Sequence, residues 1–125
     1  MGKVDFTKLV YVADTWPLIR RELTITAEDR RVVCESGTKR AEHQCTEPEW
    51  RKLEEMLSVC NFPAWQEEYH KPVLDGMHWR LEIHDAEGQV RKSEGMNAYP
   101  DAWKVFAAMC DYCADIAGFE TDGRM

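Results

Sequence analysis

Strict alternation of apolar and polar residues over Met77–His84 is the clearest pattern in the chain. Every second residue from Met77 to Ile83 is apolar, and the residues between them are polar or charged. A period of two is typical of a strand with one buried face. Asp85–Gly88 then supplies turn residues, so we expect residues 89–93 to return as an antiparallel partner strand.

A helical period follows over Pro100–Ala117. Apolar residues cover more than half of this helix, and its narrow polar stripe consists of Asp101, Lys104, Asp111 and Asp115. Pro100 is predicted to occupy the first helical position, and Gly118 to end the helix. An apolar surface this broad has to be covered from more than one direction, so we expect a sheet and a second helix around it.

Four further strands are expected before residue 46. Their predicted ranges are Val4–Ala13, Arg21–Thr26, Arg31–Glu35 and Lys39–Cys45. Turn residues separate the strands, and Trp16-Pro17 ends the first of them. The last of the four is polar enough to predict a position at the edge of the sheet.

A helix with a well-defined start is predicted after these strands. Thr46–Glu49 reads T-E-P-E, which is a capping box with proline in the first turn, and apolar residues follow at helical spacing as far as Cys60. Phe62–Trp65 is expected to begin a further short helical turn that ends near residue 69 or 70.

The predicted fold class is therefore α+β. We expect an antiparallel sheet of about five to six strands covered by two main helices, in the order β-β-β-(β)-α-β-β-α. At 125 residues, with 44% hydrophobic residues and five tryptophans, the chain can bury one core. Residues 1–119 are expected to form a single domain, and residues 120–125 a disordered tail.

Charge is distributed unevenly along the chain. The formal net charge is −7, with +2 in residues 1–40 and −9 in residues 41–125. A predominantly acidic surface argues against direct nucleic acid binding and is compatible with a basic protein surface as partner. No apolar run approaches the ~20 residues that span a bilayer, and no secretory signal is visible. With an odd number of cysteines, five, we expect reduced thiols and a cytoplasmic location, without membrane association.

Four motifs lie in sequence between Thr46 and Phe106. They are T-x-x-E-W-x-x-L, N-F-x-x-W, D-G-x-x-W-x-L-x-I and G-x-N-A-Y-P-x-x-W-x-x-F. This half of the chain resembles a scattered set of small bacterial proteins known mainly as domains of unknown function. The resemblance implies an antiparallel sheet with two helices, and it implies no activity, cofactor or catalytic residue.

Cys110 and Cys113 have the C-x-x-C spacing of a redox or zinc half-site. A reactive thiol of that kind lies at a helix N-terminus, whereas Cys110 is nearly three turns inside the predicted helix. We therefore expect both cysteines to be buried and metal-free, with metal or redox use as the alternative. A zinc site would also need Cys34, His43 or Cys45, and His43 and Cys45 lie ~6.5 Å apart along one strand face.

His78, Glu82 and His84 share the polar face of the 77–84 strand. A His/Glu/His set can bind a metal or act in acid-base chemistry. Arg80 lies among them, which favours a solvated polar face instead. No catalytic motif or phosphate-binding loop is present in the sequence, and no cofactor is expected.

Two functions remain compatible with these patterns. The first is a small acidic, non-enzymatic protein-binding module, of the kind that a phage or mobile element uses as an inhibitor by engaging a basic nucleic-acid-handling protein. The alternative is a metal- or small-ligand-binding domain, or an enzyme, that uses His78, Glu82 and His84.

The first hypothesis predicts its own binding residues. They are Glu54, Glu55, Glu67, Glu68 and Trp16. Glu47 and Glu49 are expected to pair with Arg51 and Lys52 at helical spacing, whereas these four glutamates lack equally obvious partners. Trp16 lies in a predicted loop, where an exposed tryptophan is a common interface anchor and a packed one the alternative.

Overall fold

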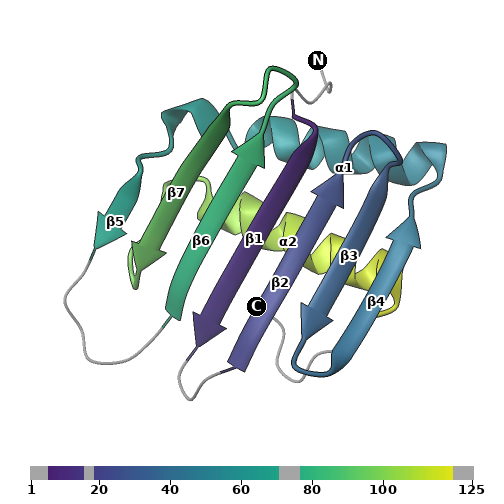
Figure 1. Cartoon of the computed structure of the whole chain (residues 1–125), viewed down its shortest axis with the longest axis horizontal. Coiled ribbons are helices and arrows are strands. Elements are labelled where there is room, and N and C mark those ends of the chain that lie inside the picture. Colours follow the sequence, from purple (N-terminus) through teal and green to yellow (C-terminus); the bar gives the residue numbers. More distant parts are fainter. Residues whose placement is uncertain (1–5, 16–18, 71–76, 120–125) are drawn as a thin grey trace.

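The computed structural model describes residues 6–15, 19–70 and 77–119 of the chain. A seven-stranded sheet forms one layer, and two helices lie across one of its faces (Figure 1). The other face carries no described helix. The α+β class and the two covering helices are confirmed, while the sheet has one strand more than the upper number expected.

The elements follow one another in the predicted order, with one addition. In chain order they are β1 (Lys8–Thr15), β2 (Ile19–Thr26), β3 (Arg31–Ser36), β4 (Lys39–Gln44), α1 (Glu47–Val59), the 3-10 helix η1 (Phe62–Ala64), β5 (Glu68–His70), β6 (Met77–His84), β7 (Val90–Met96) and α2 (Trp103–Ala117). The start predicted for the first strand, at residue 4, lies outside the described residues, as do Trp16 and the predicted tail.

The spatial order of the sheet is β4-β3-β2-β1-β6-β7-β5. All neighbouring strands are antiparallel except β5, which runs parallel to β7. β1 lies in the middle, paired with β2 on one side and β6 on the other. β4 is an edge strand, which confirms the position predicted from its polarity.

Alternation along β1 and β6 places the core between the sheet and the helices. Tyr11 is the register partner of Leu81, and Ala13 that of Trp79, and all four are buried. The intervening residues, such as Arg80, project from the uncovered face. Period two in the sequence therefore identified the buried face of β6 correctly.

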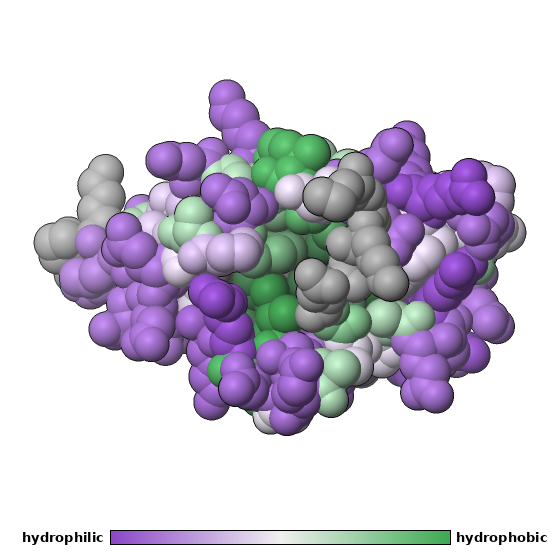
Figure 2. All heavy atoms as spheres, turned by 90° about the horizontal axis from the view of Figure 1, so that it is seen from above, coloured by the Kyte–Doolittle hydropathy of each residue, from purple (hydrophilic) through white to green (hydrophobic). Residues whose placement is uncertain are grey.

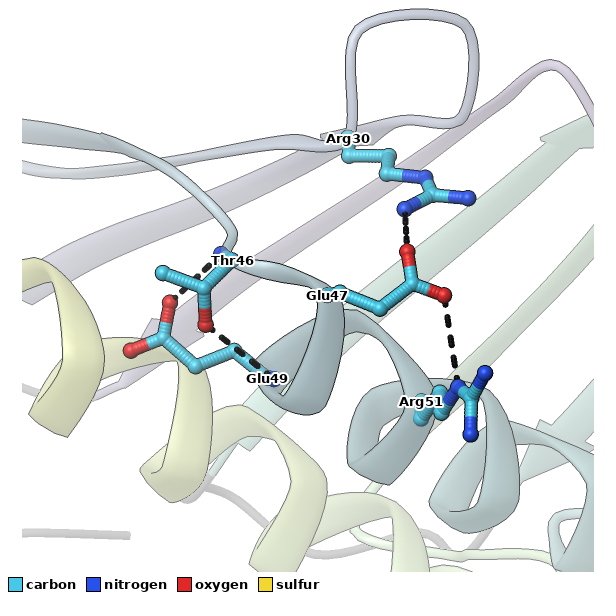
Figure 3. Close-up of polar contacts among 5 residues, drawn as sticks. All are labelled: Arg30, Thr46, Glu47, Glu49 and Arg51. Carbon is cyan, nitrogen blue, oxygen red and sulfur yellow. Dashed lines mark hydrogen bonds and ion pairs between the residues drawn. The ribbon is translucent and has the colours of Figure 1, made fainter.

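The capping box at the start of α1 is present (Figure 3). The Thr46 hydroxyl accepts a hydrogen bond from the Glu49 amide at 3.4 Å, and the Glu49 carboxylate accepts one from the Thr46 amide at 2.8 Å. These bonds satisfy amides that a helix N-terminus otherwise leaves unpaired. Trp50, Leu53 and Leu57 then face the core.

α2 begins at Trp103 and not at Pro100. The Pro100 carbonyl accepts a hydrogen bond from the Trp103 amide at 3.1 Å, so residues 100–102 form a turn before the helix. Pro100 itself is buried and lies before this turn, so it does not take the first helical position that its preference predicts. Gly118 ends the helix with φ of 68°, as predicted.

The segment after α1 differs from the predicted helical turn. Only Phe62–Ala64 is helical, and residues 68–70 form strand β5. Trp65 takes an extended conformation, and its indole N–H donates to the Cys60 carbonyl at 2.8 Å. The buried indole directs the chain toward β7, where the Glu94 amide donates to the Glu67 carbonyl at 2.9 Å. Tertiary pairing thus overrides a weak local preference.

Candidate functional site

Two of the acidic residues near the start of α1 are engaged within the domain. The Glu47 carboxylate pairs with Arg30 and with Arg51, the latter at 3.3 Å, which confirms the predicted contact with Arg51 (Figure 3). These two guanidinium groups hold the pKa of Glu47 below its usual range, and Arg30 has the larger effect. Glu47 therefore stabilises the junction between the β2–β3 turn and α1.

Glu49 does not pair with Lys52, contrary to prediction. Its carboxylate accepts the Thr46 amide and lies 2.7 Å from His43 Nε2, and these two contacts hold its pKa below the usual range. The Lys52 ammonium instead lies 4.8 Å from the centroid of the Tyr112 ring. The capping box turns Glu49 back toward the helix start, away from Lys52.

Glu54, Glu55, Glu67 and Glu68 are different, because none of their carboxylates makes an ion pair or a side-chain hydrogen bond with another described residue. Glu54 is half-buried, and the other three are exposed. Their availability for an external partner is consistent with the hypothesis drawn from the sequence.

The four glutamates do not form one cluster. Glu54 and Glu55 belong to α1, Glu67 precedes β5, and Glu68 lies within β5. Tyr69 packs against Trp79 inside the core at 5.9 Å between ring centroids, so strand alternation directs Glu68 to the uncovered face of the sheet. The helix layer and the sheet layer therefore each carry part of the set.

An apolar side chain accompanies the acidic residues of α1. Val59 is 60% exposed, more than any other large hydrophobic residue that the structure describes. It lies one turn after Glu55, on the same side of the helix. We call Glu54, Glu55, Ser58 and Val59 the α1 outer surface.

The structure does not bring His78, Glu82 and His84 together. His78 lies 3.4 Å from Glu94, and His84 lies 3.3 Å from Glu82, so the strand face holds two separate pairs. The two histidines lie six positions apart along the strand, a distance of ~20 Å. Within the described ranges, no group of three or more His, Cys, Asp or Glu residues is arranged to hold a metal ion.

All five cysteines are buried as free thiols, which confirms the predicted burial of Cys110 and Cys113. Burial raises the pKa of Cys34 to about 11 and that of Cys60 to about 12. It raises the pKa of Cys110 and Cys113 well above the usual thiol value. A thiol that stays protonated is a poor nucleophile.

A groove beside the β6–β7 hairpin was not predicted from the sequence. Its volume is about 460 Å³, and its lining consists of Trp65, Glu67, Ile83, Asp85, Gln89, Val90, Arg91 and Lys92. Figure 2 views the end of the molecule where this hairpin lies, and it shows hydrophobic side chains among hydrophilic ones there. The lining comes from three separate segments, so no local pattern indicates it.

Comparison with protein-family models and with curated proteins finds no significant match. The resemblance over residues 46–106 therefore rests on its four motifs. Separately, none of the helices in the described ranges is long and apolar enough to cross a membrane.

Proposed function

We propose that this protein is a small, acidic, non-enzymatic protein-binding module and that its α1 outer surface engages a basic surface on another protein. The strongest support is that some carboxylates of α1 have partners within the domain and others have none in the part of the chain that the structure describes. Glu47 and Glu49 are used for internal contacts, whereas Glu54 and Glu55 on the same helix have no partner among the described residues.

The exposed Val59 supports the same surface. Protein interfaces combine an apolar centre with a polar rim, and a helix face that carries both needs no rearrangement to bind. Val59 supplies the apolar side chain, Glu55 supplies charge one turn before it, and Glu54 supplies charge on the adjoining side of the helix. The carboxylates steer the encounter with a basic partner, and the valine contributes to the lifetime of the complex.

The class of partner follows from the sign of the charge. A net charge of −7 on 125 residues repels nucleic acid and attracts the basic surfaces with which proteins bind it. A module of this kind acts as an inhibitor when it occupies such a surface in competition with the nucleic acid. This is the role that we propose, with a phage or mobile-element origin as its natural context.

Charge reversal with a matched control tests the proposal. A Glu54→Lys/Glu55→Lys variant and a Glu67→Lys/Glu68→Lys variant both change the net charge from −7 to −3, because each reversal adds two. The association rate with a partner purified by pull-down is measured against ionic strength. The α1 variant should associate more slowly and show a weaker salt dependence, while the control variant stays near the wild type.

The outcomes separate the alternatives. Equal slowing by both variants would mean that only net charge matters and that the α1 outer surface is not the interface. Unchanged association of the α1 variant would contradict the proposal. A Val59→Ser variant should leave the association rate unchanged and increase the dissociation rate.

A further inference from the structure

One edge of the sheet is only partly covered. β7 runs from Val90 to Met96, but β5 pairs only with its final part, Glu94–Met96. Along Val90–Lys92, β7 has β6 on one side and no described strand on the other. The sheet therefore has a step at this edge, where β5 begins.

The backbone groups at this step point outward. In an antiparallel pair, alternate residues direct their amide and carbonyl toward the partner strand and away from it. The Glu94 amide points away from β6, since it donates to the Glu67 carbonyl at 2.9 Å. Residues two and four positions earlier, Lys92 and Val90, have the same orientation. Their amides and carbonyls thus continue the line of groups that β5 uses.

The groove of about 460 Å³ lies beside these outward groups. Trp65 and Glu67 form one wall, and β7 forms the other. Ile83 and Arg91 are register partners on the side of the helices, while Lys92 is paired with Glu82 on the uncovered face. An extended peptide placed here would have the Trp65 and Ile83 side chains on one side and Lys92 on the other.

The available charge along β7 is positive. Neither Arg91 nor Lys92 makes an ion pair or side-chain hydrogen bond with another described residue. The nearby Asp85 carboxylate keeps its negative charge, but it lies in the hairpin turn before β7, where one of its oxygens accepts hydrogen bonds from the Glu87 and Gln89 amides at 2.9 Å each. Glu67 is the remaining carboxylate of the groove, and it belongs to the opposite wall.

We propose that this groove binds an extended acidic segment of a partner protein, which pairs with Val90–Lys92 as an additional strand in line with β5. Backbone hydrogen bonds supply the affinity, and Arg91 and Lys92 select acidic side chains on the two faces of the added strand. The site is distinct from the α1 outer surface, and the side chains on β7 that select the ligand are basic and not acidic, so the two proposals succeed or fail separately.

The first test uses two labelled hexapeptides, in which pairs of adjacent glutamates or pairs of adjacent lysines are separated by single valines, so that each peptide presents its charge on both faces of the strand. Fluorescence anisotropy should show at least about tenfold tighter binding of the acidic peptide by the wild type. An Arg91→Glu/Lys92→Glu variant should abolish or reverse this preference. A Lys39→Glu/Arg40→Glu variant carries the same charge change on the other edge strand, β4, and should retain the preference.

The second test asks whether binding uses the backbone of β7. Hydrogen exchange should be fast at the Val90 and Lys92 amides of the free protein and slow when the acidic peptide is bound. The same peptide with N-methylated valines should bind weakly, since it cannot complete the strand pairing.

Several results would overturn the proposal. They are equal binding of the two peptides, an absence of saturable binding up to millimolar acidic peptide, and protection that maps to β4. Slow exchange at Val90 and Lys92 in a concentration-dependent dimer would show that a second copy occupies the edge. Free glutamate that competes fully without protecting these amides would show a small-anion site only.

Discussion

The two ends of the core are built from different kinds of side chain. Around β6, η1 and the start of α2, ring-to-ring contacts connect Tyr11, Phe62, Trp65, Tyr69, Trp79, Tyr99, Trp103 and Phe106. Around β3, β4 and the later turns of α2, sulfur-containing side chains dominate, namely Cys34, Cys45, Met109, Cys110 and Cys113. We call these the aromatic end and the thiol end.

The two ends differ in how much space and which hydrogen-bond partners their buried side chains require. At the aromatic end, the indole N–H groups of Trp65 and Trp79 donate to the backbone carbonyls of Cys60 and Ala98 at 2.8 and 2.9 Å. A buried indole needs both space for its ring and an acceptor in one direction. A thiol needs neither, since it is small, polarisable and a weak donor. We therefore expect the aromatic end to tolerate substitution less well.

Trp79→Ala should have the largest effect on stability. The Trp79 ring has no exposed surface and contacts three other aromatic rings, those of Trp65, Tyr69 and Trp103. Its removal should lower the free energy of unfolding by ~3–5 kcal/mol, through lost burial and the cavity left behind. Urea unfolding followed by circular dichroism measures this value. Cys113→Ala, at the thiol end, should lower the free energy of unfolding by only ~1 kcal/mol. A larger loss for Cys113→Ala than for Trp79→Ala would contradict the expectation that the aromatic end tolerates substitution less well.

Gly95→Ala should be the next most damaging change. A Cβ atom at residue 95 would lie 2.4 Å from Trp79 Nε1 and 2.5 Å from the Ala98 carbonyl oxygen, which are the two atoms of one hydrogen bond. The cost should be ~1–3 kcal/mol, since neither atom can move without breaking that bond. In a double-mutant cycle, Trp79→Phe should cost less in the Gly95→Ala background than in the wild type. Additive effects would mean that the clash is relieved elsewhere.

Alkaline pH should weaken the thiol end. Burial raises the pKa of Cys34 and Cys45 to about 11, so these thiols ionise in the unfolded chain, near pH 9, before they ionise in the folded one. Stability from the protonated thiols is complete below pH 9 and is lost as the pH rises toward 11. Urea unfolding at pH 8, 9 and 10 should show this decline. A Cys34→Ala variant should decline less steeply, and an identical slope would assign the loss to other groups.

Local patterns predicted the elements whose signals lie within one segment. The alternation of Met77–His84, the capping box at Thr46 and the stop at Gly118 each act through neighbouring residues, and the structure contains all three. The hairpin after β6 and the edge position of β4 were predicted for the same reason.

Features that depend on distant residues could not be predicted in this way. Glu68–His70 has no pattern of its own and becomes β5 only because Trp65 brings it to β7. Asp111, predicted to be on the solvated stripe of α2, is half-buried and lines a cavity of about 40 Å³ with Arg21. The groove depends on the unequal lengths of β5 and β7, which only their pairing shows.

The smallest predicted effect lies at the start of α1, beside Cys45 at the thiol end. Thr46→Ala removes the hydroxyl that accepts the Glu49 amide and should cost ~1 kcal/mol. Thr38→Ala, in the exposed β3–β4 turn, should cost much less and serves as the matched control.

The Glu49 contacts make the stability of this end depend on pH in the acid range as well, because they hold the pKa of Glu49 below its unfolded value of 4.5. Their stabilisation is present above pH 4.5 and is lost as the pH falls through the lower folded pKa. Urea unfolding between pH 6 and 3 should therefore show a shallower decline in Glu49→Gln than in the wild type, and parallel declines would show that Glu49 does not contribute.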